Sequence, residues 1–395
     1  MKNESAAGGK SANQRYAYVL LIYLCLLSSL ALNYSQTVPR KTTSLYKTQP
    51  LNFHGLRTYP LASRPSKVQV GQFAKPHRQG ASFAEFLDSL PRILAAEDLR
   101  LVARAILDAR SQSRTILWGI GGHVIKVGLG PLLIDLVRRG FISGIAMNGA
   151  ALIHDFEIAV AGGTSEDVDA VLGEGKFGMA EETGRSINEM AAIAKRSGIG
   201  LGEAAGEFLA QKNIHAKHID HSVLAAAYRA KIPVTVHLAI GADISHIHRT
   251  ASGENLGAAT HRDFKLFCAL VREMHPGGVY LNWGSAVILP EVFLKAVTVA
   301  RNLGTPLRPI TTANFDFLQH YRPLQNVVKR PTAAAPGDDG ETEAEKSRGY
   351  AITGHHEILL PLLAAALVEA DEPAANEKTA RASKPSHRQR PPRTR

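Results

Sequence analysis

The chain has 395 residues, with 46 lysines and arginines against 35 acidic residues and a formal net charge of +11. The excess positive charge lies in residues 1–82 and 371–395, which leaves about −3 for the interior, 83–370. An interior without net positive charge gives no support to nucleic-acid binding. Two cysteines exclude a disulfide framework or a cysteine-rich zinc site, so we expect a reducing compartment, the cytoplasm.

Residues 16–32 form a largely apolar run that follows several basic residues. Its length suits a signal-peptide core or a short membrane anchor. Three interpretations stay open: an anchor through residues 16–32, a cleaved signal peptide, and an upstream translation start that adds a segment foreign to the fold. Ala31–Asn33 is a poor cleavage site, and the third interpretation requires a start codon other than Met. We expect contact with a membrane only if this segment, within the linker 1–50, is genuine.

Strands and helices alternate from residue 83 onward, as in a sheet built from strand–helix–strand units. The spacing predicts helices at 83–110 with a break at Pro91, 131–139, 179–195, 202–211, 220–230, 260–274, 290–302 and 358–368, and strands at 115–119, 141–147, 233–240, 278–282 and 307–312. Residues 331–349 are predicted to be an exposed low-complexity loop and 371–395 a disordered basic tail. The expected fold is α/β, with a doubly wound, mostly parallel sheet in one domain at 51–370.

The stretch Ser113–Gly140 runs from a short apolar strand through a glycine-rich turn into an amphipathic helix, which is how a dinucleotide site begins. Gly121 and Gly122 allow close approach of a ligand, and a helix N-terminus attracts a pyrophosphate. The pattern by itself is a weak indication. Val124 replaces its third glycine, and no acidic residue ends a second strand about 20 residues further on.

Four further predicted strand ends carry polar or small residues. Ligands bind at the carboxyl ends of the strands in an open parallel sheet, so we expect these residues to converge on one nucleotide, NAD. The candidate residues at all five strand ends are Gly121, Gly122, His123, Asn148, Gly149, Asp243, Gly284, Thr311 and Thr312.

Five segments carry a family resemblance: Gly122–Gly128, Asn148–Ala150, His154–Glu157, Phe177–Arg185 and Thr353–Glu357. They resemble the deoxyhypusine synthase family, and its bacterial deoxyhypusine synthase-like branch in particular. The resemblance implies the nucleotide-binding fold of that family, bound NAD, a small-molecule amine substrate and a homo-oligomer such as a tetramer. It also places His355 and His356 where the family approaches the dinucleotide.

The sequence departs from the family in its reaction residues. Eukaryotic members oxidise spermidine to an imine and transfer its aminobutyl group through the lysine of a Trp-Gly-Lys motif, which has no counterpart here. Lys329 is the nearest basic candidate but lacks the tryptophan, and Ile288–Pro290 replaces a histidine pair that serves the amine. We therefore expect no adduct on Lys329 and a reaction that differs from deoxyhypusine synthesis.

The predicted catalytic residues are His154, Asp155 and Asp243: a carboxylate binds a cationic polyamine or related amine, and a histidine moves a proton during hydride transfer. Structural capping is the competing interpretation for His154, Asp155 and Glu157, which we place at a helix start. The leading function is an NAD-dependent, transferase-type enzyme. The alternatives are a non-catalytic nucleotide-binding sensor or scaffold and, ranked last, a metal-dependent hydrolase, because the histidine spacings fit no strong metal template.

Overall fold

The computed structural model describes residues 45–211, 216–334, 342 and 345–371. The apolar run at 16–32, the tail from 372 and much of the predicted loop at 331–349 lie outside these residues. The chain divides into two units after Ser66. In the first unit the described residues contain one 3₁₀ turn, Leu61–Ser63, and no buried side chain, and residues 51–66 belong here although we assigned them to the folded domain. No helix within the described ranges is long and apolar enough to cross a membrane.

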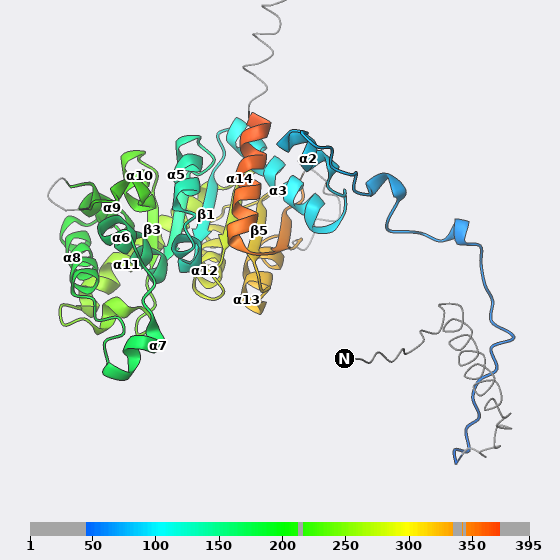
Figure 1. The fold of residues 1–395 in the computed structure, drawn as a ribbon, viewed down its shortest axis with the longest axis horizontal. Coiled ribbons are helices and arrows are strands. Elements are labelled where there is room, and N and C mark those ends of the chain that lie inside the picture. Colours follow the sequence, from blue (N-terminus) through cyan, green and yellow to red (C-terminus); the bar gives the residue numbers. More distant parts are fainter. Residues whose placement is uncertain (1–44, 212–215, 335–341, 343–344, 372–395) are drawn as a thin grey trace, which may run out of the picture. The chain divides into compact units, whose positions relative to one another are not determined.

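The second unit contains a six-stranded sheet in which every described pairing is parallel, in the order β3-β2-β1-β4-β5-β6 (Figure 1). The strands are β1 Ile116–Ile120, β2 Gly144–Asn148, β3 Val234–His237, β4 Val279–Trp283, β5 Thr311–Asp316 and β6 Arg348–Thr353. The chain moves outward from β1 to β3 and returns to the centre for β4. This reversal creates a topological switch point between β1 and β4, where open α/β sheets bind their ligands.

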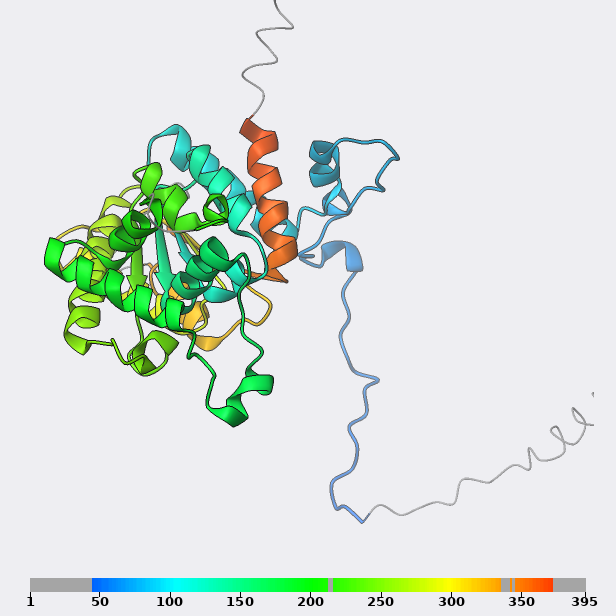
Figure 2. The same ribbon diagram turned by 60° about the vertical axis from the view of Figure 1, so that its left-hand side comes forward.

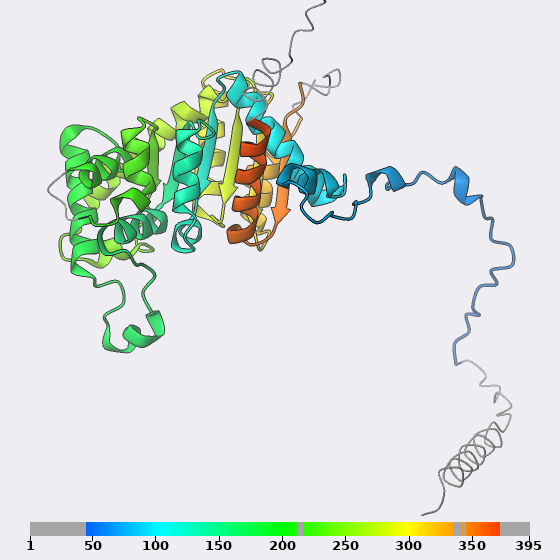
Figure 3. The same ribbon diagram turned by 45° about the horizontal axis from the view of Figure 1, so that its top comes forward.

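Helices connect the strands and cover both faces of the sheet (Figures 2 and 3). The helices are α2 Phe83–Ser89, α3 Leu94–Ser111, α4 Gly122–Lys126, α5 Gly130–Arg138, α6 Gly149–Ala161, α7 Val168–Val171, α8 Glu181–Ser197, α9 Leu201–Ala210, α10 Val223–Arg229, α11 Gly253–Glu273, α12 Ile288–Asn302, α13 Tyr321–Pro323 and α14 His356–Asp371. A π-helical turn, Leu324–Lys329, follows α13. The predicted doubly wound α/β fold is thereby confirmed, as is the break between α2 and α3.

Side chains of β1 alternate between two apolar cores, one on each face of the sheet. Ile116, Trp118 and Ile120 pack with residues of α3, α5, α6 and α14, whereas Leu117 packs with residues of α11 and α12. Successive side chains of a strand point to opposite faces. Burial on both faces explains why the central strands read as short continuous apolar runs.

Helix α11 covers the open edge of β3. The Asp263 carboxylate accepts hydrogen bonds from Val236 N at 2.8 Å and from Gly202 N, at the start of α9, at 2.9 Å. Thr260 Oγ1 donates to Val236 O and accepts from Leu238 N. These contacts satisfy edge groups that would otherwise pair with another strand. Burial raises the pKa of Asp263 to about 7.

The strand predicted at 307–312 is present, but it lies further along the chain. The strand begins only after Pro309, which has no N–H for a ladder hydrogen bond, and β5 spans Thr311–Asp316. Thr311 pairs with Val279, the first residue of β4, so Thr311 and Thr312 lie at the edge opposite Gly121. The hydroxyl of Thr312 is buried and donates to a backbone carbonyl of the π-helical turn.

Two other boundaries differ from expectation. Strand β6 lies partly within residues 331–349, which we predicted to be a loop. Helix α6 begins at Gly149, where the Asn148 side chain accepts from Ala151 N at 2.9 Å, so His154 lies in its second turn and not at its start. After α6, the segment that carries α7 projects beyond the neighbouring elements in all three views (Figures 1, 2 and 3).

Candidate functional site

The loops after β1 and β4 touch at the switch point. Gly121 N donates to Trp283 O at 2.8 Å, and a Cβ on Gly121 would lie 2.2 Å from Gly284 O. Gly121 has an ordinary φ of −81°, so the contact with Gly284, and not a left-handed backbone, requires glycine here. Gly284 has a φ of +64°, and a Cβ there would lie 2.9 Å from the ring of His356. We call Gly121, Gly284 and His356 the glycine junction.

The rings of His123, Phe317 and His355, which follow three different strands, lie around the glycine junction. The ring of His123, at the start of α4, lies 5.4 Å from that of His356 and 5.9 Å from that of Phe317. Phe317 follows β5, is 44% exposed, and stacks parallel to the exposed ring of His355. The structure therefore brings His123, His355 and His356 together, as the sequence predicted of their positions.

The His356 side chain presents an unpartnered nitrogen at this edge. Its Nε2 lies 3.2 Å from the carbonyl oxygen of Phe315, and because a carbonyl only accepts, Nε2 carries a hydrogen. The carboxylate of Asp316 lies 4.0 Å from the same nitrogen. Nδ1 is buried and has no hydrogen-bond partner among the described residues. A buried polar atom without a partner fits a ligand that brings a polar group to it.

The pKa of the neighbouring His123 is lowered, first by burial and then by the positive character of His356 and Lys126. A neutral imidazole can donate one hydrogen bond and accept another, so His123 can bind polar groups of either kind.

Asp243 occupies the N-terminus of α6. A Cβ on Gly149 would lie 2.3 Å from the carboxylate of Asp243, which also accepts from Ala239 N at 2.9 Å. Burial raises the pKa of this carboxyl group. Asn148 caps the same helix end, so protein groups already use the positive end of the α6 dipole. Asp243, Asn148 and Gly149 lie at the carboxyl edge, where the sequence placed them.

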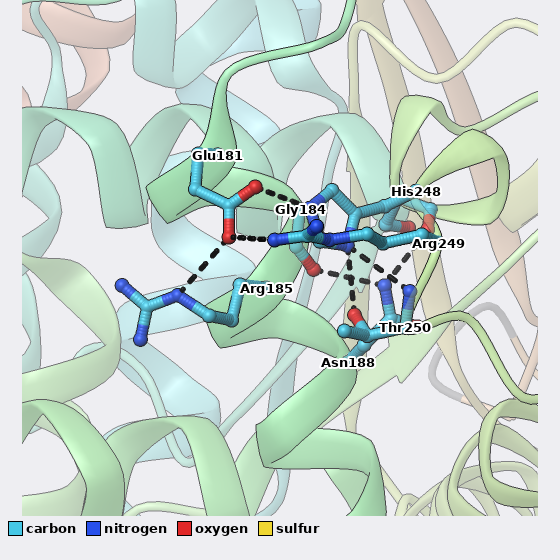
Figure 4. A network of polar contacts seen from close by, with 8 residues as sticks. Glu181, Gly184, Arg185, Asn188, His248, Arg249 and Thr250 are labelled. Atoms are coloured by element: carbon cyan, nitrogen blue, oxygen red, sulfur yellow. Dashed lines mark hydrogen bonds and ion pairs between the residues drawn. The ribbon is translucent and has the colours of Figure 1, made fainter.

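Hydrogen bonds and ion pairs hold the loop that carries Asp243 against α8 (Figure 4). Glu181 contacts His248 Nε2 at 3.2 Å and Arg249 Nη2 at 3.4 Å, and Asn188 Nδ2 donates to Ser245 O at 2.9 Å. The hydrogen bond with His248 lowers the pKa of Glu181. Glu181 lies on an exposed face of α8, and it also holds the loop in place. In the part of the chain that the structure describes, no cluster of three or more potential ligands is arranged to hold a metal ion.

The structure gives Asp155, which we predicted to be catalytic, hydrogen bonds to the start of α10. Its buried carboxylate accepts from Ser222 Oγ at 2.6 Å, Val223 N at 2.7 Å and Leu224 N at 3.2 Å. These groups open α10, and the carboxylate satisfies its first N–H groups. Burial raises the pKa of Asp155 to about 6, although these hydrogen bonds oppose the shift. The competing interpretation placed Asp155 at the start of its own helix; Asn148 caps that helix instead, and Asp155 caps α10.

His154 lies beside α4. A Cβ on Gly122 would lie 3.1 Å from Cδ2 of its ring, and its Nδ1 is 2.7 Å from Thr164 Oγ1. Thr164 Oγ1 is in turn 2.5 Å from a carboxylate oxygen of Glu157, and Thr183 Oγ1 donates to the other oxygen at 3.1 Å. Neither threonine was predicted from the sequence. The path of the folded chain after α6 brings them to Glu157, and no residue spacing in the sequence indicates that path.

Lys329 is exposed at the end of the π-helical turn. The preceding Val328 carbonyl packs on Gly349, near the start of β6, where a Cβ would lie 2.1 Å from the oxygen. Lys329 is therefore at the amino edge of the sheet, opposite the glycine junction. A cavity of about 720 Å³ also lies toward that edge, lined by Pro233, Val234 and residues of α9, α10 and α11, and none of the predicted site residues lines it.

No family model and no curated protein matches the chain. Among solved structures, the chain is similar to a conserved, proposed LOR/SDH protein from Methanococcus maripaludis S2, with 17% identity, a TM-score of 0.43 and coverage of 70% of both chains. It is similar to AgrE in a ternary complex with ornithine and NAD+, with 14% identity, a TM-score of 0.43, and coverage of 72% of this chain and 35% of AgrE. It is also similar to a proposed deoxyhypusine synthase from Entamoeba histolytica, with 11% identity, a TM-score of 0.44, and coverage of 75% of this chain and 96% of that one. The chain thus spans about a third of the length of AgrE.

Proposed function

We propose that the protein is an NAD-dependent enzyme that acts on a polyamine or related amine by transferase-type chemistry without an imine on Lys329. The observation that carries this proposal is the position of His123 beside the glycine junction, which is Gly121, Gly284 and His356, at the β1/β4 switch point. Dinucleotides bind at such switch points in open parallel sheets. The motif resemblance to the deoxyhypusine synthase family supports the choice of NAD and of an amine.

NAD supplies a hydride acceptor when it is bound. The proposed binding residues are those that lie at the carboxyl edge: Gly121, Gly122, His123, Asn148, Gly149, Gly284, His355 and His356. Thr311 and Thr312 leave this set because they lie at the opposite edge. The unpartnered Nδ1 of His356 and the ring of His123 offer polar contacts, and the exposed ring of Phe317 offers a face for stacking.

Asp243 is the proposed carboxylate for the cationic amine. It is half-buried, and a cationic nitrogen beside it would favour its charged form and offset the cost of burial. His154 is the proposed proton acceptor, because it lies beside α4 with one ring nitrogen held by Thr164. Asp155 has no part in this scheme, since it caps α10.

Native mass spectrometry, followed by denaturation and identification of the released small molecules, tests the proposal. We expect one NAD per chain and consumption of an amine when NAD and candidate polyamines are added together. Stoichiometric NAD with no amine consumed would favour the sensor or scaffold. We also propose a homo-oligomer, which the same native spectra report through the mass of the complex.

A further inference from the structure

Glu157, Thr164 and His154 form a linear series of hydrogen bonds, which we call the relay. His154 and Glu157 lie on one face of α6, because residues three apart on a helix are neighbours. Thr164 lies between them, 2.7 Å from His154 Nδ1 and 2.5 Å from Glu157 Oε2. Thr183, from α8, donates to the second oxygen of Glu157 and fixes the orientation of the carboxylate. The relay therefore joins α6, the loop after it and α8.

The direction of the hydrogen bonds follows from the single hydrogen on the Thr164 hydroxyl. The Glu157 carboxylate only accepts, so this hydrogen goes to Glu157. The Thr164 oxygen must then accept from His154, which places the hydrogen of the neutral imidazole on Nδ1. Nε2 is left with a free lone pair.

Nε2 makes no hydrogen bond with the described residues. It is bonded to Cδ2, the atom that packs on Gly122 at the start of α4. The charged or titratable groups facing the ring are Glu157 on its own helix and Lys126 and His123 on α4. Burial lowers the pKa of His154, and the attraction of Glu157 opposes this shift. The ring is therefore neutral near neutral pH, with Nε2 able to take a proton.

We propose that Glu157 and Thr164 are positioning residues that hold His154 as a general base with Nε2 as the accepting atom. In the step, an N–H bond of the substrate ammonium group breaks and its electron pair stays on nitrogen. The proton forms a new N–H bond at Nε2, and the Nδ1–H···Thr164···Glu157 series stabilises the resulting imidazolium. The identity of the substrate rests on the proposed function, whereas the tautomer of His154 does not.

Nitrogen NMR of the full chain labelled with ¹⁵N-histidine measures the tautomer directly, with His154→Gln to assign the signals. We expect Nδ1–H in the wild type at pH 8, a shift toward Nε2–H in Thr164→Val, and the wild-type tautomer in Thr164→Ser. Glu157→Gln removes a negative charge and should lower the pKa of His154 further. Thr250→Val is the matched control, because it removes the same kind of hydrogen bond from His248 and should leave the His154 signals unchanged.

Kinetics with the amine substrate give the second readout. Thr164→Val should lower kcat by about 10²-fold with little change in KM, the loss expected when a general base is misplaced, and Thr164→Ser should restore most of it. An Nε2–H tautomer in the wild type, or a tautomer insensitive to Thr164→Val, would overturn the relay. Full activity in His154→Gln would overturn the general-base role. The expected tautomers without turnover of any amine would support the relay and count against the proposed function alone.

Discussion

The carboxylate of Asp243 lies directly over the Cα of Gly149, where a Cβ would be only 2.3 Å from it. Gly149→Ala should therefore displace Asp243 from the N-terminus of α6 and weaken amine binding by about tenfold, the loss of one charge-assisted contact. Calorimetric titration of the amine into NAD-loaded protein measures the change. Gly163→Ala is the matched control, since a Cβ there meets no atom within 4 Å and should leave the affinity unchanged. Equal affinities in both variants would remove Asp243 from the amine site.

Gly121→Ala should destabilise the fold by about 1–3 kcal/mol, because a Cβ at this position overpacks the backbone of Gly284. Urea denaturation gives the free energy of unfolding. Gly257→Ala, in the interior of α11 with nothing within 4 Å of the added carbon, should instead stabilise by about 0.5–1 kcal/mol. If Gly121→Ala is as stable as the wild type, the loops after β1 and β4 are not in the contact described here.

Asp263 should make the stability depend on pH. Its pKa is raised to about 7 in the folded chain, from an ordinary value of 3.8, so the folded state binds the proton more tightly than the unfolded state. The contribution of this group is then largest at low pH and falls as the pH rises from about 4 to about 7, by up to roughly 4 kcal/mol. Unfolding free energies of the wild type and Asp263→Asn across this range provide the comparison. The wild type should lose stability relative to the variant as pH rises, and a difference that stays constant would contradict the buried, protonated carboxyl.

The central strands were predictable because β1, β2 and β4 are buried on both faces and read as apolar runs. Strand β5 was displaced in the prediction because the apolar residues before Pro309 resemble a strand but do not pair. The contact of Asp155 with α10 was not predicted because Ser222 lies 67 residues away in sequence, and nothing near Asp155 indicates that contact. His154 was found from a local motif, whereas Thr164 and Thr183 reach Glu157 only through the path of the folded chain.

Lys329→Ala should leave turnover unchanged, because Lys329 lies at the amino edge of the sheet, away from the glycine junction. Incubation with spermidine and NAD, borohydride reduction and intact-mass analysis detect any covalent imine. We expect no added mass on the wild type. A trapped aminobutyl adduct that disappears in Lys329→Ala would restore the lysine mechanism of the eukaryotic family.

We propose that NAD binds at the carboxyl edge of the β1/β4 switch point, and calorimetric titration of NAD into the purified full chain measures this binding. We expect a one-to-one complex whose affinity falls at least tenfold in His123→Ala, which removes a half-buried ring from the edge, and is unchanged in Lys329→Ala at the opposite edge. Absence of NAD binding at millimolar concentrations, or equal affinities in the wild type and His123→Ala, would contradict it.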